Sequence, residues 1–572
     1  MNYELLLYLG RLNVIIIRLM LFLLVVSAIF IFRKRKAPLG LVIAAMVVFS
    51  LAFTNSLLLP EIDLMYNDDL YYKSMGLAIS DFGNYYLYHT EGSWGPFPKS
   101  LGFPFMLSLV YSSGILNPKV SSYANSFFYG LGLTLFLILL WNIFKTTPSE
   151  KETLKQKDKK NKTSRKELVF PALAFIMLIL LWSNVLFKDL SSTGETHVFS
   201  VLTILTFIYF LISFFKRKFS FWNIAALASS ALISAVSRPE NIIVVAVMYV
   251  LFLIFIFVDK KKAWWLLGTA FFVTLLCIPN VLVIKSEYVE THYAEGGNFG
   301  LDKIKDNIIF FSNTVLSTQK ETGVVMIISL IYSLSFCFWF LAIKFVPAFI
   351  KALKGIRTPL RDNKTGNQVI QVILALVFIA FTIVIFISYI DSNRAPRVYL
   401  TPIVLAYLVL GCLVMRIAGI LFDAEPKKKA LLWILVIVIS LGALSSFITA
   451  ARWERDTRIA SNHRRDQLDM SERIYHYFND IEEEFYLVTQ YPEALFFLRN
   501  RVISIDAFLE HNEMLKNKSI YIWLDNLFNS HTFQRRKTEE LYYWLGERAR
   551  IMTVFRYTSG GYQSTLEKLL WD

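Results

Sequence analysis

Residues 368–390 read QVIQVILALVFIAFTIVIFISYI, a run of 23 residues without a charged side chain. About 20 apolar residues are enough for a helix to cross the hydrocarbon core of a bilayer. Eleven other segments have a similar length and composition: 13–32, 38–59, 121–144, 168–187, 197–215, 220–236, 241–258, 263–284, 324–347, 399–420 and 430–450. The sequence therefore predicts a polytopic α-helical membrane protein with about twelve transmembrane helices.

The composition of the whole chain agrees with this fold class. The 572 residues are 55% hydrophobic and 18% charged, with a mean hydropathy of +0.49, which lies outside the range of soluble proteins. Much of the net charge of +15 falls in short loops such as 145–166 and 260–262. Lysine-rich loops between apolar segments indicate the cytoplasmic side of a membrane, and they give no reason to expect a nucleic-acid partner.

The same rule predicts which loops lie outside the cytoplasm. With the basic loops inside, the extracytoplasmic segments are 60–120, 188–196, 285–323, 391–398 and everything from residue 451 onward. Residues 101–116 do not fit as a further span, because crossing there would place the lysine-rich loop 145–166 outside. We therefore expect 101–116 to form a helix at the membrane interface, ended by Pro118.

The chain is predicted to have two domains. Residues 1–450 form the membrane domain, and residues 451–572 form a smaller extracytoplasmic domain. In the second domain, short runs rich in β-branched and aromatic residues alternate with helix-like stretches at 485–488, 502–505, 519–523 and 551–557. This alternation is typical of an α/β module with parallel strands.

The first outer loop, 60–100, carries many acidic residues and ends in a turn rich in Pro and Gly that contains Lys99. Asp68 and Asp69 begin a predicted helix, where carboxylates stabilise the helix dipole and Asn67 could cap the first turn. Alternatively, one of the two aspartates acts as a general base on an acceptor, while its neighbour binds a metal or orients the substrate. Both interpretations remain open.

The second outer loop contains Glu195 and His197 at the start of the next apolar helix. Ionisable residues at the end of a membrane helix are candidates for function because burying them unpaired is costly. A structural alternative is a helix cap formed by Thr193, with Glu195 in the first turn. If a divalent metal ion is used, Asp69 and Glu195 are the ligands we expect.

Arginines occur in two further outer turns. Arg238 and Glu240 lie between two apolar helices, and Arg394 and Arg397 lie in the turn 391–398. A guanidinium group can bind a phosphate or pyrophosphate through two parallel hydrogen bonds. Arginines that only anchor a helix at the membrane interface would give the same sequence pattern.

The order of these features resembles the GT-C class of membrane glycosyltransferases, and within it the dolichyl-phosphate-mannose protein mannosyltransferase and aminoarabinose transferase group. The resemblance covers about the first 450 residues. The segments that carry it are the tandem acids Asp68 and Asp69, the turn Pro96-Phe97-Pro98-Lys99-Ser100-Leu101-Gly102-Phe103-Pro104, the helix 121–144, the loop 191–197, Ser237-Arg238-Pro239-Glu240 and Arg397-Val398-Tyr399-Leu400-Thr401-Pro402.

The resemblance implies an enzyme that takes a sugar from a polyprenyl-phosphate carrier and passes it to an extracytoplasmic acceptor. In that class an acid of the first outer loop serves as base or metal ligand, which here corresponds to Asp68 or Asp69. Lys99, Glu195, His197, Arg238, Glu240, Arg394 and Arg397 would then bind the substrates. Two departures are an extra helix at 13–32 and the α/β pattern of the C-terminal domain. The Trp-Trp-Asp-Tyr-Gly signature of oligosaccharyltransferases is absent, which argues against that branch.

A transporter or flippase of lipid-linked glycans is the alternative function. The same acids and arginines would line its pathway. No clear internal repeat and no matched pair of broken helices is found in the sequence, and these are the usual signs of a transporter. The expected location in either case is the plasma membrane, with several spans surrounded by membrane lipids.

Overall fold

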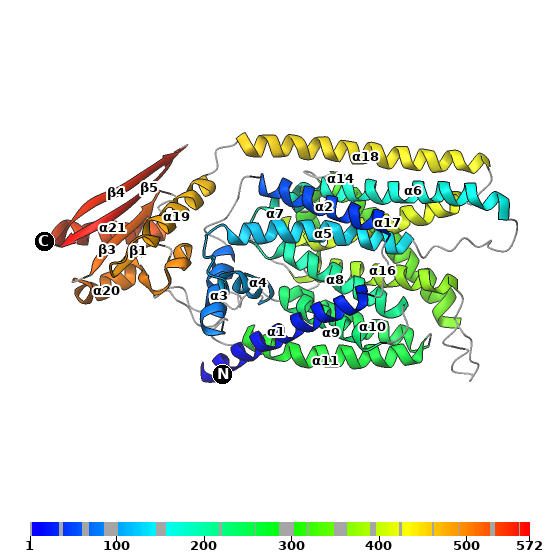
Figure 1. The fold of residues 1–572 in the computed structure, drawn as a ribbon, viewed down its shortest axis with the longest axis horizontal. Helices are drawn as coiled ribbons and strands as arrows, with labels where there is room; N and C mark the ends of the chain where they lie inside the picture. The colour runs from blue at the N-terminus through cyan, green and yellow to red at the C-terminus, as the bar shows by residue number, and fades with distance from the viewer. Residues whose placement is uncertain are drawn as a thin grey trace.

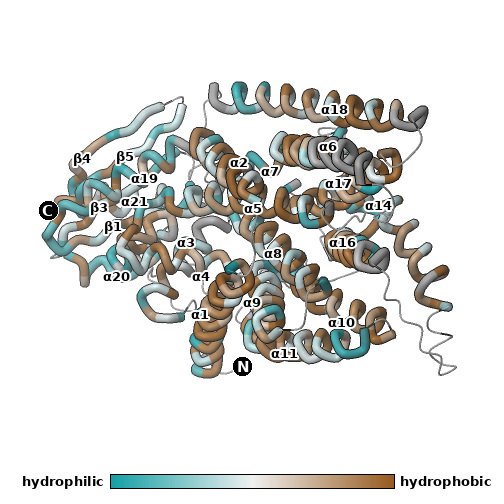
Figure 2. Tube along the Cα trace, turned by 45° about the vertical axis from the view of Figure 1, so that its right-hand side comes forward, coloured by the Kyte–Doolittle hydropathy of each residue, from teal (hydrophilic) through white to brown (hydrophobic). Residues whose placement is uncertain are grey.

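The computed structural model describes residues 3–33, 38–59, 68–84, 101–144, 156–216, 220–257, 259–284, 303–316, 320–347, 350, 363–388, 396–422, 426–459, 463–490, 492–516, 518–526, 532–559 and 561–571. These residues form a large helical bundle and a smaller domain built on a β-sheet at one end of it (Figure 1). Hydrophobic residues dominate the bundle and polar residues dominate the smaller domain (Figure 2). The predicted fold class is therefore confirmed.

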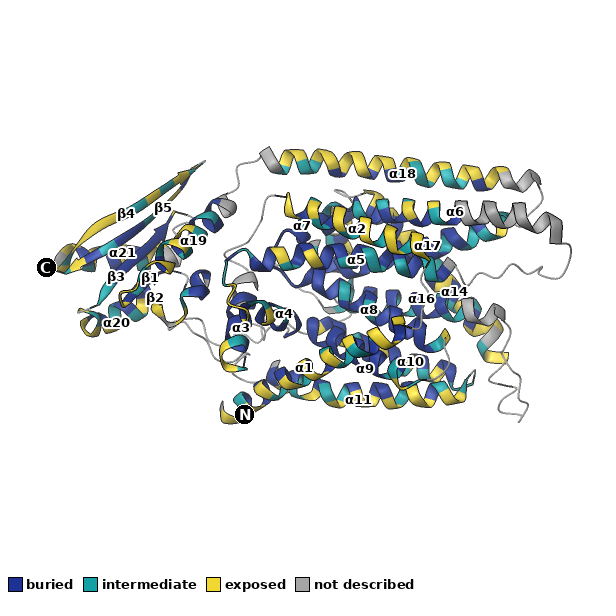
Figure 3. Cartoon of the chain, viewed as in Figure 1, coloured by how far each residue is buried: buried dark blue, intermediate teal, exposed yellow. Residues whose placement is uncertain are grey.

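Within the described residues, nine helices are long and apolar enough to cross a membrane. They are α1 (Tyr3–Arg33), α2 (Leu39–Leu57), α5 (Val120–Phe144), α8 (His197–Lys216), α11 (Lys260–Ile284), α14 (Lys320–Trp339), α16 (Asn363–Ser388), α17 (Leu400–Phe422) and α18 (Pro426–Ile459). In the apolar stretch of α8, 83% of the residues are buried, but in that of α18 only 17% are. Helix α8 therefore lies inside the bundle, and α18 lies along its outside (Figure 3).

The other three predicted spans, 168–187, 220–236 and 241–258, are helical, but each is either bent or too short to count as a full span. Helix α6 (Gln156–Trp182) and helix α7 (Val185–Ser191) meet at a bend of 65° and count as a tenth span only if they are taken together. Helix α9 (Phe221–Ser237) and the segment formed by η1 (Pro239–Ile242) and α10 (Ile243–Phe255) are shorter than a full span. The proline at residue 239 separates these two segments, because its ring and missing N–H do not continue a helix.

Several short elements connect the long helices. They are α3 (Asp68–Phe82), α4 (Gly102–Tyr111), α13 (Lys303–Phe311), η2 (Ser312–Leu316), η3 (Phe340–Phe345) and η4 (Pro396–Tyr399). Helix α4 has ten residues and is about 15 Å long, so it cannot cross a bilayer. Most of its side chains are buried, packed against α3, α5 and α9. Its position at a membrane interface stays a prediction.

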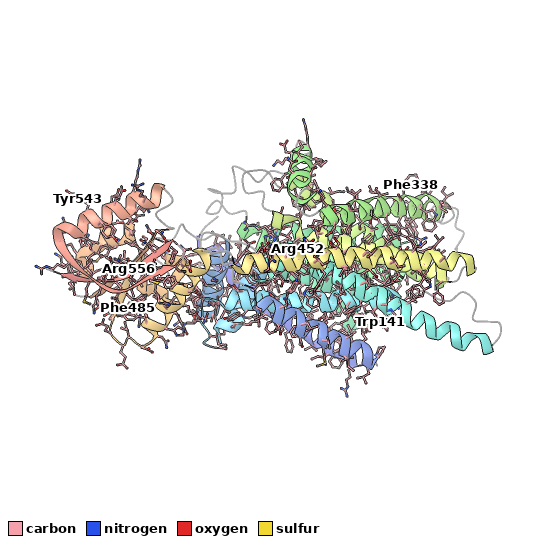
Figure 4. The ribbon with its side chains drawn as sticks, turned by 90° about the horizontal axis from the view of Figure 1, so that it is seen from above. Trp141, Phe338, Arg452, Phe485, Tyr543 and Arg556 are labelled. Atoms are coloured by element: carbon pink, nitrogen blue, oxygen red, sulfur yellow. The ribbon has the colours of Figure 1, made fainter. Side chains whose placement is uncertain are left out.

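The lysine-flanked ends of three helices meet at one end of the bundle. The Lys216 ammonium at the end of α8 donates a hydrogen bond to the backbone oxygen of Asn142 in α5, at 3.0 Å. Lys262, at the start of α11, donates to the backbone oxygen of Phe215, at 2.6 Å. Trp141 and Phe338 lie away from the small domain, whereas Arg452 of α18 lies nearer to it (Figure 4). The basic residues at this end agree with the prediction that the lysine-rich loops lie on one side of the membrane. That this side is cytoplasmic stays a prediction.

The C-terminal domain contains a mixed five-stranded sheet in the order β2-β1-β3-β5-β4. Its strands are β1 (Phe485–Thr489), β2 (Val502–Ser504), β3 (Ser519–Asp525), β4 (Ala549–Ser559) and β5 (Tyr562–Trp571). The helices are α19 (His463–Asn479), η5 (Pro492–Arg501), α20 (Ile505–Leu515) and α21 (Thr532–Arg548). Trp523 of the central strand β3 is fully buried, and its indole N–H donates to the Ser564 hydroxyl of β5 at 2.8 Å.

The four predicted strands run in the same direction, but the sheet contains a fifth strand that was not predicted. Strands β1, β2 and β3 are parallel, as expected for the α/β pattern. Strand β5, which was not predicted, lies between β3 and β4 and is antiparallel to both, so β4 runs in the same direction as β3 but does not pair with it. Strand β5 pairs with β4 in this way because the tight turn that contains Gly561, with φ of +91°, joins them, and a short connection can join only antiparallel neighbours.

Candidate active site

Five of the residues predicted to bind substrate come together in the structure. Glu195 lies between α7 and α8, His197 begins α8, Arg238 and Glu240 flank Pro239, and Arg397 lies in η4. We call these five residues the Arg–Glu–His cluster. Three predicted outer turns that are far apart in sequence therefore contribute to one site.

The remaining predicted site residues cannot be placed in the cluster. Lys99 and Arg394 lie outside the described residues, as does most of loop 60–100. Asp68 and Asp69 begin helix α3, which confirms the predicted helix, but their side chains are not among those described. Their roles stay predictions.

Local sequence explains why Arg238 leaves its helix. Its backbone is extended, with φ of −154° and ψ of 151°. A residue that precedes proline is disfavoured in the helical region, so α9 ends at Ser237. Pro239 then occupies the first position of η1, where no N–H is required. The turn holds the Arg238 side chain within the protein, where it is 10% exposed.

The cluster is a continuous set of charged and polar contacts. Arg397 donates a hydrogen bond to Glu195 Oε1, and Arg238 Nε donates to Glu240 Oε1. One terminal nitrogen of Arg238 lies 2.7 Å from His197 Nδ1 and 2.8 Å from its Nε2. His197 Nε2 is 3.2 Å from Glu195 Oε2. Because a guanidinium group only donates, the imidazole nitrogen that bonds Arg238 must be unprotonated.

Pairing explains how so many charges are tolerated inside the protein. The two arginines balance the two glutamates, and buried ions require such partners. Glu195 is 3% exposed, and its second oxygen, Oε2, faces His197 Nε2 at 3.2 Å, so both of its carboxylate oxygens have polar neighbours within the cluster. Arg397 is the most exposed member, with 22% of its side chain accessible, and is therefore the group best placed to meet a ligand.

The charges also determine the ionisation of Glu195. Burial raises the pKa of this carboxyl group, but the contact with His197 and the charges of Arg397 and Arg238 outweigh burial. The pKa of Glu195 therefore lies below its usual value, and the side chain is a carboxylate at neutral pH.

Residues outside the predicted set hold the cluster in place. Asn125 of α5 donates to the backbone oxygens of Thr193 and Glu195, both at 2.6 Å. Asn241 donates to the hydroxyls of Ser200 and Ser237, both at 2.8 Å. Asn125 was missed because it belongs to a predicted span, although a polar residue within a membrane helix is itself a signal of function.

Helix α4 packs against the end of α9, next to the cluster. A Cβ on Gly102 would lie 2.9 Å from the Cα of Ser237, so only glycine permits this approach. The Phe103 ring lies 6.2 Å from that of Phe199 in α8 and 5.8 Å from that of Tyr72 in α3. These aromatic contacts connect the helix that begins with Asp68 and Asp69 to the helix that begins with His197.

The second outer loop is shorter than predicted. Lys188 and Asp189 belong to helix α7, and the buried Lys188 ammonium forms an ion pair with Glu454 of α18. The structural alternative, in which Thr193 caps the following helix, is not found. Helix α8 begins at His197, and the Thr193 hydroxyl instead donates to the backbone oxygen of Leu190 at 3.0 Å.

The described part of the cluster fits an anion better than a metal ion. No group of three His, Cys, Asp or Glu side chains that could hold a metal occurs among the described residues. Both glutamates of the cluster are already bonded to arginines, and two guanidinium groups repel a nearby cation. The metal-ligand roles of Asp69 and Glu195 stay predictions.

A Glu195→Gln variant tests the charge of the buried carboxylate. The lowered pKa of Glu195 contributes stability that is fully present above the usual carboxyl pKa of about 4.3 and is lost progressively as the pH falls from there toward its folded-state pKa of about 2. At pH 7 we expect the variant to unfold at a lower temperature in detergent, with a loss of about 1.5–3 kcal/mol. The difference in unfolding temperature between the wild type and the variant should become smaller at pH 4 and below.

The matched control is Glu513→Gln, because Glu513 is exposed on α20. It should leave the unfolding temperature unchanged at both pH values. An equal gap between wild type and Glu195→Gln at pH 7 and pH 3.5 would contradict the lowered pKa.

No family model and no curated protein matches the sequence. Two crystal structures of the Archaeoglobus fulgidus oligosaccharyltransferase are similar to the chain. One, with Zn and sulfate, has a TM-score of 0.42 and 13% identity over 92% of this chain and 72% of that chain. The other, in the apo form, has a TM-score of 0.42 and 12% identity over 91% and 74%.

The archaeal oligosaccharyltransferase AglB from Archaeoglobus fulgidus, in complex with an inhibitory peptide and a dolichol-phosphate, is similar at the same level. It has a TM-score of 0.40 and 14% identity over 91% of this chain and 74% of that chain. At these values no activity is inferred from the likeness. The predicted place of the chain within the mannosyltransferase and aminoarabinose transferase group stays a prediction.

Proposed function

We propose that this protein is a membrane glycosyltransferase that moves a sugar from a polyprenyl-phosphate-linked donor to an extracytoplasmic acceptor. The observation that carries the proposal is the convergence of Arg238 and Arg397 on Glu195 and His197. The resemblance of the sequence to GT-C enzymes predicted these turns as parts of one site. Two guanidinium groups beside an apolar bundle are suited to the phosphate of a lipid-linked substrate.

The reaction would be an inverting displacement at the anomeric carbon. The acceptor oxygen or nitrogen forms the new bond, the bond from the carbon to the carrier phosphate breaks, and the carrier keeps both electrons as a phosphate anion. Arg397 and Arg238 would stabilise the charge that develops on this leaving group. Asp68 or Asp69 would take the proton from the acceptor. Glu195 would hold Arg397 and His197 in position beside the phosphate.

The test is sugar transfer by membranes that contain the wild type or an inactive variant at equal expression. Radiolabelled sugars on polyprenyl phosphate are supplied as donors, and total membrane lipid and protein serve as acceptors. We expect transfer by the wild type and loss of transfer in a combined Arg238→Ala, Arg397→Ala variant. A parallel arm with EDTA shows whether a metal ion is needed.

The matched control is Arg455→Ala, because Arg455 is 70% exposed on α18 and lies outside the cluster. It should transfer sugar like the wild type. If wild-type membranes transfer no sugar from any donor, but move lipid-linked glycan between leaflets, the glycosyltransferase proposal is wrong and the transporter alternative replaces it.

A further inference from the structure

The C-terminal domain touches the two short helices that follow the first membrane spans. The guanidinium group of Arg499 in η5 lies 2.9 Å from Asp81 Oδ2, near the end of α3. The ring of Phe496 lies 5.5 Å from that of Tyr111 at the end of α4. Both of these aromatic side chains are almost fully buried, so the contact excludes water at its centre.

A second group of contacts fixes the same domain beside α5. Lys119, just before α5, lies 3.0 Å from Glu472 and 3.4 Å from Asp469, both in α19. Asn117 donates to Glu472 at 3.1 Å. Burial raises the pKa of Glu472, but its bonds to Asn117 and Lys119 outweigh burial, and the pKa is lowered. The domain therefore has two separate sets of polar contacts with the membrane domain, which define its orientation as well as its attachment.

Arg499 holds an unfavourable backbone conformation at this contact. Its φ is 57°, and among the described residues it is the only one besides glycine with a positive φ. A side chain with a Cβ rarely adopts this region, and such residues persist where the surrounding structure requires them. The strained residue of η5 is therefore Arg499, the arginine that forms the ion pair with Asp81 of α3.

Helix α3 can transmit this contact to the proposed active site. It has 15 residues and is about 22 Å long, with Asp68 and Asp69 at the other end from Asp81. A Cβ on Gly76 would lie 3.1 Å from the backbone oxygen of Pro104, so α3 packs closely on α4. Just after the helix, Asn84 donates to the backbone oxygen of Leu7 in α1 at 2.9 Å.

We propose that Arg499 is a positioning residue, through which the docked C-terminal domain sets the position of α3 and of the aspartates at its start. The inference rests on the proposed function, because the consequence for activity requires that Asp68 or Asp69 reacts with the acceptor. Arg499 itself acts through α3 and touches neither substrate. The C-terminal domain is then a structural part of the catalytic unit, rather than a separately tethered module.

Variants that reverse the charge of Arg499 or Asp81 test the proposal in the full-length protein. Arg499→Glu and Asp81→Arg each place like charges together, and the double variant restores an ion pair in reverse. An exposed pair contributes up to about 1 kcal/mol, which corresponds to roughly fivefold in an equilibrium, and like charges add to the loss. Each single variant should lower kcat of transfer by about fivefold or more with KM for the donor little changed, and the double variant should recover.

Amide hydrogen exchange of residues 72–84 provides the second measurement. Exchange in α3 should become faster in both single variants and return toward the wild-type rate in the double variant. Arg499→Gly removes the side chain and relieves the positive φ, so it should resemble Arg499→Glu if the ion pair matters. Wild-type exchange rates in all four variants, or wild-type kcat in both single variants, would overturn the proposal.

The two measurements distinguish this inference from the proposed function. If no sugar transfer is found for the wild type, the proposed function fails. Exchange in α3 still reports whether Arg499 holds the helix. Suppose that transfer is found, that the single variants speed amide hydrogen exchange in α3, and that kcat of transfer stays unchanged. The contact is then structural only, and the positioning role is wrong.

Discussion

An Arg397→Ala variant is expected to transfer sugar at least ~10² more slowly than the wild type, mainly through kcat. The arginine is the most exposed member of the Arg–Glu–His cluster and bonds the buried Glu195. Removing one preorganised donor to a developing anion costs about 10²–10³ in rate in enzymes studied by mutagenesis. The measurement is the steady-state rate of transfer from a polyprenyl-phosphate-linked donor, with Arg455→Ala as the control.

Loss of activity in Arg397→Ala could also follow from instability, because the variant leaves Glu195 as an unpaired buried charge. A double variant, Arg397→Ala with Glu195→Gln, removes both charges and separates the two explanations. We expect it to regain thermal stability and to remain slow in transfer. If transfer returns together with stability, Arg397 serves only to neutralise Glu195, and its role toward the phosphate is wrong.

Asp68→Asn and Asp69→Asn should differ sharply in their effects on transfer. The aspartate that serves as general base should lose about 10²–10⁴ in kcat when it becomes an amide, since that is the usual contribution of general acid–base catalysis. The other aspartate should lose much less. Rates are measured under saturating donor and acceptor, with Asp456→Asn as a control because Asp456 is 66% exposed on α18.

Nearly equal rates for both aspartate variants and the wild type would contradict the predicted base. The pH profile adds a separate criterion. A missing base should abolish the fall of activity on the acidic side of the profile, whereas a misplaced helix should lower activity at every pH. A combination of Asp69→Asn with EDTA treatment shows in addition whether this residue acts through a metal ion.

The sequence predicted the fold class and most helices because their signal is local. A run such as 368–390 has the length and composition of a span whatever it packs against. The break between α9 and η1 could also be anticipated, because Pro239 lies between the predicted spans 220–236 and 241–258. Strand β5 was missed because its charged residues, such as Glu567 and Lys568, weaken the alternation of polar and apolar side chains.

The members of the cluster could be predicted, but the contacts between them could not. Ionisable residues at helix ends are recognisable one at a time, as Glu195 and Arg397 were. That Arg397 bonds Glu195 depends on how η4 packs beside the loop before α8, which no local pattern encodes. For the same reason the buried pair of Lys188 and Glu454 had no visible signal, since its partners lie on separate helices.

The packing of α1 determines the order in which the membrane domain can be assembled during synthesis. This helix packs against α9 and α11, with Phe30 stacked on Trp222 at 4.3 Å. The ribosome makes α1 before its partner α9, and four predicted spans come between them in the chain: 38–59, 121–144, 168–187 and 197–215. Until α9 is made, α1 must be stable in lipid without it, which the mean hydropathy of 3.0 of its apolar 18-residue stretch allows. Helix α1 is therefore expected to dock on α9 and α11 only after the helices between them have been inserted.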